Sequence, residues 1–298
     1  MLQRLFTNQL ALGGAQAAAV TLLALLVVLL ARKREIHLER ETIVALSRGI
    51  VQIIAVGSIF IFLLRGPAWT GMLLLAPMIV AAAAISAHRA KGIPGTFRVS
   101  LCAIATGSGT VIALMTLAGV LDTTITSLVP LGSMLIYNAM NANSLTLNRF
   151  RSEVESHFGL IETALALGAA SKQAVAPYVQ VSFRTSLIPA VDSLKSLGIV
   201  WIPGLMAGML LAGSDPVYAA IYQFVTISMI LSASGLTVLI STLLIRNHAF
   251  SPAEQLTLRP QAIPSRRDVV AGQNESSNRS MNATAFLILG SVFGFITN

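Results

Sequence analysis

The fold is decided by residues 162–213, which read ETALALGAASKQAVAPYVQVSFRTSLIPAVDSLKSLGIVWIPGLMAGMLLAG. The first part of this stretch is a polar, helix-forming connection. The second part is a helical pattern that proline and glycine interrupt at Trp201 to Gly204. At membrane depth an interrupted helix is tolerated only where its backbone lines a cavity or is buried in protein, and such helices often frame transport sites. The stretch therefore predicts an irregular span within a membrane protein.

Composition points to the membrane independently of that stretch. Of the 298 residues, 55% are hydrophobic and 11% are charged, with a mean hydropathy of +0.77, whereas a soluble domain carries about 25% charged residues. The net charge of +8 resides in short loops between apolar runs, where Lys and Arg set topology rather than bind nucleic acid. Cys102 is the single cysteine, so the chain can form no internal disulfide.

Seven apolar segments predict an all-α polytopic fold, with spans at about 10–31, 43–64, 72–87, 99–121, 128–147, 185–213 and 217–245. Basic loops alternate with loops that are poor in basic residues. This alternation predicts an inner-membrane protein whose N-terminus lies outside and whose polar tail is cytoplasmic. Residues 1–258 would form the transmembrane domain. Residues 259–298 would be a polar extension, whose apolar end at 283–296 is short for a span.

Residues 148–184 are predicted to form a cytoplasmic pair of helices between the fifth and sixth spans. Gly168 interrupts the helical pattern, and the Ser171 hydroxyl can cap a second, short helix that ends near Ala176. An exposed, bent helix pair suits docking into a cleft on a soluble partner. The alternative is a solvated connector with no partner.

Glu162-Thr-Ala164-Leu-Ala-Leu-Gly168 resembles the EAA loop of ABC-transporter permeases, a coupling helix that fits a groove on the ATP-binding subunit. Thr163 replaces the first alanine of that pattern, and the later I-x-L-P of the pattern is out of register here. The resemblance implies that Glu162, Ala164, Gly168 and Ser171 contact an ATPase. The chain has no G-x-x-x-x-G-K-[ST], so it cannot cradle ATP phosphates in the usual way. We therefore expect no cofactor in this chain, and ATP-Mg would be bound by the partner.

A longer series of motifs resembles the FetB family, a permease class assigned to iron export in bacteria. The motifs occur in order as Tyr137-Asn-Ala-Met140, Ser186-Leu-Ile-Pro-Ala-Val-Asp-Ser-Leu-Lys195, Gly198-Ile-Val-Trp-Ile-Pro-Gly-Leu-Met-Ala-Gly208, Gly213-Ser-Asp-Pro-Val217 and Tyr222-Gln223. Plant relatives are linked to aluminium tolerance and to nucleotide-sugar transport. The resemblance implies a transport permease rather than an enzyme, working as a homodimer with a separate ATPase and exporting iron or another metal.

Polar side chains inside spans are costly and are therefore candidates to line a substrate path. Asp192 and Lys195 share a helix face and can neutralise each other, either beside the path or in headgroup water on an interfacial helix. Arg48 and Gln52 also share a face, where Arg48 can reach the headgroups or serve an ion path.

Amides and thioethers form a second set of candidates. Asn138, Met140 and Asn141 cluster in the fifth span, near Met134 and Asn143, and Gln223 lies in the seventh. Such groups tie helices together in lipid, or contact a passing metal weakly. They identify no metal, because a hard ion would normally need several carboxylates.

Three functions remain open from the sequence. The first is an ABC permease for a metal or a nucleotide sugar. The second is a gradient-driven transporter that uses Asp192 and Lys195 as its coupling pair. The third is a membrane scaffold that binds a partner without transporting anything. Only the first function gives a role to the helix pair that Gly168 interrupts.

Overall fold

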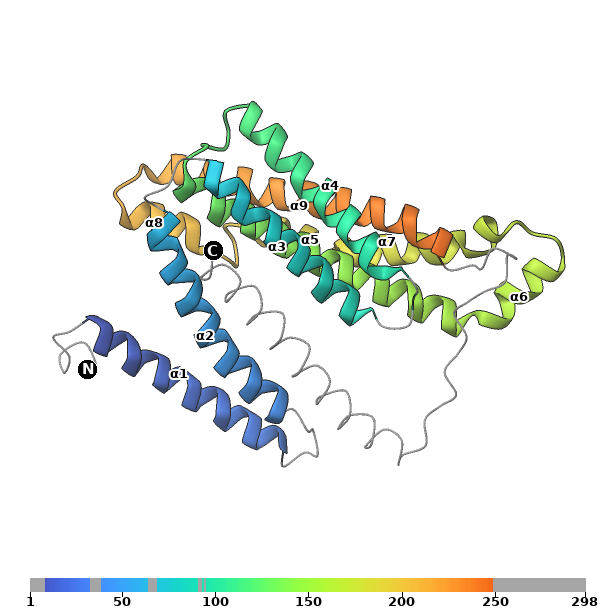
Figure 1. Cartoon of the computed structure of the whole chain (residues 1–298), viewed down its shortest axis with the longest axis horizontal. Helices are drawn as coiled ribbons and strands as arrows, with labels where there is room; N and C mark the ends of the chain where they lie inside the picture. The colour runs from blue at the N-terminus through green and yellow to red at the C-terminus, as the bar shows by residue number, and fades with distance from the viewer. Residues whose placement is uncertain (1–8, 33–38, 64–68, 91–92, 94, 249–298) are drawn as a thin grey trace, which may run out of the picture. The chain divides into compact units, whose positions relative to one another are not determined.

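The computed structural model describes residues 9–32, 39–63, 69–90, 93 and 95–248. These residues form nine α-helices and no strand (Figure 1). The helices are α1 Gln9–Arg32, α2 Glu39–Leu63, α3 Trp69–Arg89, α4 Thr96–Leu117, α5 Ile125–Ser156, α6 Phe158–Ala166, α7 Ser171–Ser196, α8 Gly204–Leu211 and α9 Pro216–His248. The all-α prediction is confirmed for this part of the chain. The predicted extension at 259–298 lies outside the described residues.

The chain divides into two compact units, 1–73 with 123–128, and 74–122 with 129–298. In the described residues three helical stretches are long and apolar enough to cross a membrane, Thr70–Arg89, Thr96–Leu117 and Pro216–Arg246. Shorter apolar stretches lie in α1 and α2, at Gly13–Val28 and Thr42–Ser58. This arrangement is that of a polytopic membrane protein.

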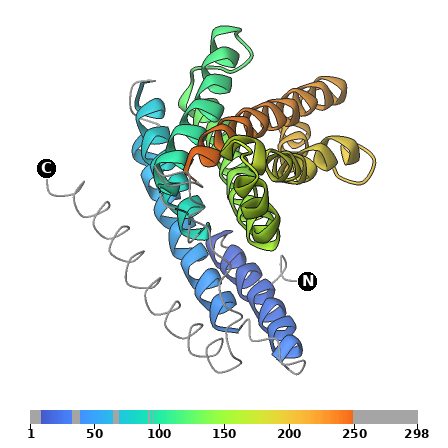
Figure 2. The same ribbon diagram turned by 90° about the vertical axis from the view of Figure 1, so that its right-hand side faces the viewer.

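The second unit is built around α9, which runs alongside α4 and α7 (Figure 1, Figure 2). The approach of α4 is closest at Gly107, because a Cβ there would lie 2.7 Å from the backbone nitrogen of Thr237. Small residues let helices pack backbone to backbone where lipid removes the hydrophobic driving force. The α4–α9 contact is therefore tight.

A buried polar cluster joins α3, α4 and α5. The Nδ2 group of Asn143 donates to the hydroxyls of Ser86 at 2.7 Å and Ser100 at 2.9 Å. The hydroxyls of Ser144 and Ser86 lie 3.1 Å apart. These four side chains are almost completely buried. The prediction that an amide of the fifth span ties helices together is thus confirmed for Asn143, and we call these four residues the Asn143 cluster.

An apolar core lies at the end of the second unit where α6 is found. Its buried members come from α4, α5, α6, α7, α9 and the α3–α4 connection: Ala90, Ile93, Val99, Leu147, Phe150, Val154, Ile161, Val175 and Ile245. Ile161 is the one buried side chain of α6. Ile161 therefore anchors α6 in this core, and the partly buried Phe158 and Leu165 of the same helix pack against it.

The structure corrects the predicted helix pair. No helix starts near Asn148, because α5 continues without a break to Ser156, and the separate helix before Gly168 is the shorter α6. The second helix is not short, because α7 runs on through Pro177 and Pro189 to Ser196. Ser171 is not a cap: the extended backbone of Ala170 already ends the turn, so Ser171 is the first helical residue. The break at Gly168 is confirmed, with φ +88°.

The predicted interruption of the sixth segment is also present. α7 ends at Ser196, and residues 197–203 form a tight turn before α8 begins at Gly204. Both helices contact α9, so the interrupted segment follows α9 in two pieces.

Candidate functional site

A cavity of about 130 Å³ lies between α5, α7 and α9. Its walls are amide, hydroxyl and small apolar side chains: Asn138, Asn141, Ala142 and Leu145 of α5, Ser186, Pro189, Ala190 and Ser193 of α7, and Ser234 of α9. The α5 and α7 members recur at intervals of three and four residues, which places each set on one helix face. Two small and polar helix stripes thus face one another across a space that can hold a guest.

The cavity walls offer hydrogen bonds without a formal charge. Asn138 Nδ2 donates to the carbonyl of Met134 at 2.8 Å, and Ser193 donates to the carbonyl of Pro189 at 2.8 Å. Asn141 Oδ1 accepts from Arg89 Nη1 at 3.2 Å. The Arg89 guanidinium therefore contacts a residue of the cavity lining, although Arg89 itself does not line the cavity. Pro189 has no N–H, which leaves the Thr185 carbonyl without its usual helical donor. The site can therefore hold a hydrogen-bonding guest.

Two of the predicted substrate-path residues, Asn138 and Asn141, are brought together in this cavity. Met140 is buried elsewhere in the packing, and its carbonyl accepts from Ser144 at 2.9 Å. Gln223 is buried on α9 beside α8 rather than in the cavity wall.

The four charged and polar candidates that remain lie away from the cavity lining. Asp192 and Lys195 are exposed on α7, and no ion pair joins them among the described residues. Arg48 and Gln52 are exposed on α2, in the other compact unit. In the same part of the chain that the structure describes, no group of three His, Cys, Asp or Glu residues could hold a metal ion.

The α6 helix presents an apolar outer face. Leu160 is 64% and Leu167 is 84% exposed, although Ile161 between them is buried. Glu162 and Gly168 are exposed as well, whereas Ala164 and Ser171 are half-buried. Exposed side chains of this segment form what we call the α6 surface: Leu160, Glu162, Thr163, Ala166 and Leu167.

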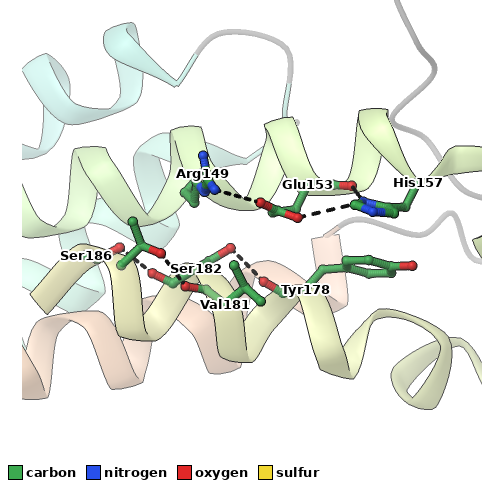
Figure 3. A network of polar contacts seen from close by, with 8 residues as sticks. Arg149, Glu153, His157, Tyr178, Val181, Ser182 and Ser186 are labelled. Atoms are coloured by element: carbon green, nitrogen blue, oxygen red, sulfur yellow. Dashed lines mark hydrogen bonds and ion pairs between the residues drawn. The ribbon is translucent and has the colours of Figure 1, made fainter. Parts of the chain in front are cut away.

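A joint at His157 connects α5 to α6 (Figure 3). The His157 ring stacks on Tyr178 of α7, with centroids 4.8 Å apart. Its Nδ1 lies 3.7 Å from Glu153 Oε2, and Glu153 pairs with Arg149 at 3.1 Å (Figure 3). Sequence reasoning missed this joint, because only the folded chain brings His157 to a residue twenty-one positions later.

Residues 15–250 match the profile of an uncharacterised protein family, UPF0014. The chain belongs to the UPF0014 family. The resemblance to FetB-type permeases is confirmed by its relatives within this family. The chain is 33% identical over 242 residues to the probable iron export permease protein FetB of Escherichia coli (strain K12), covering 81% of this chain and 93% of that one.

Two plant proteins are similar over comparable lengths. Protein ALUMINUM SENSITIVE 3 of Arabidopsis thaliana is 32% identical over 246 residues, which is 82% of this chain and 90% of that protein. The UPF0014 membrane protein STAR2 of Oryza sativa subsp. japonica is 30% identical over 253 residues, 84% of this chain and 88% of that one. No solved structure matches the chain.

Proposed function

We propose that this UPF0014 member is the transmembrane subunit of an ABC transporter, and that it exports iron or another metal. A separate ATPase would bind the α6 surface, ATP-Mg would bind to that ATPase, and two copies of the chain would pair in the inner membrane. The metal cargo is taken from the printed name of the FetB relative. In this topology seven spans place the N-terminus outside and α6 in the cytoplasm.

The α6 surface is the observation that carries the proposal. Burial of an exposed leucine side chain by a partner contributes about 1.5–3 kcal/mol to the free energy of binding. Leu160 and Leu167 both offer this gain, and Ile161 holds the helix in place from behind. An apolar ridge that is fixed to the core but left open suits a groove on a soluble protein.

The same helix is connected to the cavity through the chain on both sides. On one side α6 meets α5 at His157, and on the other it reaches α7 through Gly168. α5 and α7 supply eight of the nine residues that line the cavity. Displacement of α6 by an ATPase would therefore move two of the three cavity walls.

Co-purification tests the proposal with a matched pair of glycines. Gly168 and Gly213 have φ of +88° and +87°, and a Cβ on either would meet no atom within 4 Å. Both substitutions with arginine carry the same backbone strain, but only Gly168 adjoins the α6 surface. We expect an ATPase subunit to co-purify with the wild-type chain and with Gly213→Arg, and to be lost with Gly168→Arg.

Transport assays separate the remaining functions. In vesicles that contain the chain and its ATPase, export should require ATP, and iron should stimulate hydrolysis. Gradient-driven export without any ATPase would instead favour the Asp192 and Lys195 pair. Partner binding without flux would identify a scaffold.

A further inference from the structure

The turn between α7 and α8 uses most of its own backbone donors. The carbonyl of Ser196 accepts from the N–H groups of Ile199, Val200 and Trp201, at 3.2, 3.1 and 3.3 Å. Gly198 N–H donates to the carbonyl of Trp201 at 3.0 Å. The turn therefore closes on itself, and the backbone donors left over lie beyond it, where α8 begins.

The first turn of α8 has free N–H groups. Pro203 occupies the cap position and supplies no side-chain acceptor. Among the described residues the N–H groups of Gly204 and Leu205 have no acceptor, and the Met206 N–H donates to Gln223 Oε1 at 3.1 Å. Gly204 is exposed, and a Cβ on it would meet no atom within 4 Å, so the start of α8 is open beside this residue.

Gln223 adds a third donor beside this turn. Its side chain is 1% exposed, and its Nε2 group has no partner. Since the Met206 N–H must face an oxygen, the orientation of the amide is fixed and the unpaired group is the NH₂. A buried donor left unpaired is costly, and the described residues supply no acceptor for this one.

Among the residues that the structure describes, no acceptor satisfies these three donors. Asp215 lies at the other end of α8, but its Oδ1 already caps α9 by accepting from Val217 and Tyr218, both at 2.9 Å. The start of a helix carries a partial positive charge of about +0.5. Free N–H groups at such a start favour carboxylate and phosphate oxygens.

We propose that the N-terminus of α8, completed by Gln223 Nε2, binds an oxyanion of a soluble ligand, a carboxylate or a phosphate group. This site lies apart from the cavity, on the far side of the turn at residues 197–203.

The test measures anion binding to the full chain in phosphatidylcholine nanodiscs, without any ATPase. Citrate and inorganic phosphate serve as probes, at constant ionic strength with chloride as the reference anion, and thermal melting gives the apparent Kd. Gln223→Glu keeps an oxygen for the Met206 N–H and exchanges the free donor for an anionic oxygen. We expect this variant to bind citrate at least tenfold more weakly than wild type.

A second variant removes a different donor, in case Gln223→Glu impairs folding. Gly204→Pro deletes one free N–H at the first helical position, where proline is favoured. The preceding residue is already extended, with ψ 153°, as a residue before proline must be. We expect a weaker citrate Kd with an unchanged anion-free melting temperature. The control is Thr226→Val, which removes a buried hydroxyl bonded only to its own helix.

Each outcome decides for or against the proposal. Loss of citrate or phosphate binding in Gln223→Glu or Gly204→Pro, but not in Thr226→Val, supports it. Absence of saturable binding in wild type, or equal Kd values in all variants, overturns it. Nanodiscs that contain phosphatidylglycerol form a separate arm: Gln223-dependent stabilisation by that lipid alone would assign the site to a headgroup and overturn the soluble ligand. Because no ATPase is present, failure of the docking proposal leaves these results unaffected.

Discussion

Replacing Leu167 by alanine should weaken ATPase binding without affecting the fold of the chain. Leu167 is 84% exposed, so nearly all of its apolar surface is available to a partner. Burial of a whole leucine contributes about 1.5–3 kcal/mol, and alanine retains one methyl group. A loss of about 2 kcal/mol corresponds to a ~30-fold increase in Kd.

The assay titrates purified ATPase against the chain in nanodiscs and compares Leu167→Ala with Leu117→Ala. Leu117 is 85% exposed, and it lies at the end of α4 that is remote from Val99 and the core around α6. The control should keep the wild-type Kd, and both variants should keep the wild-type melting temperature. An unchanged Kd for Leu167→Ala, or an equal loss in the control, would refute the docking surface.

Two further predictions follow from the packing. Gly107→Ala should destabilise the second unit by about 1–3 kcal/mol, because the new methyl overpacks the α4–α9 contact. Gly109→Ala should stabilise it slightly, since its Cβ would meet nothing within 4 Å and alanine is favoured over glycine inside a helix. Equal unfolding midpoints for the two variants would contradict the close approach. Ala190→Phe should fill the cavity of about 130 Å³ and stop transport in vesicles while ATPase binding persists. Ile188→Phe, at a half-exposed position of α7 outside the cavity lining, should transport normally. Wild-type flux through Ala190→Phe would show that cargo does not pass there.

Local chemistry explains what the sequence predicted well. Gly168 marks a turn because few other residues adopt a positive φ. Pro203 cannot continue a preceding helix, and it stands at the cap of α8, which Gly204 begins. Each of these breaks depends on the residue at the break itself. Long apolar runs likewise predicted α3, α4 and α9, since a span needs only length and apolar composition.

The sequence alone could not predict which faces of neighbouring helices contact one another and which are exposed. The spacing of Asp192 and Lys195 correctly places both on one face of α7, but nothing local shows that this face is exposed. The stripe at Asn138 and Asn141 was identified, whereas the serines of α7 and α9 complete the cavity only once three helices pack together. The prediction that Ser171 caps the helix was wrong for a local reason. The helix begins after the extended residue Ala170, and a serine is equally acceptable as a cap or as the residue after it.

The length of α5 has a mechanical consequence. It is a single 32-residue helix, and the Asn143 cluster pins it to α3 and α4 near its middle. At 1.5 Å per residue, its joint at His157 lies about 20 Å from that pin. Pro130 lies on the other side of the pin, and no proline interrupts the helix between Asn143 and Ser156. A pull on α6 would therefore turn this segment about the Asn143 cluster as one lever, and its displacement would be largest at the end that carries α6.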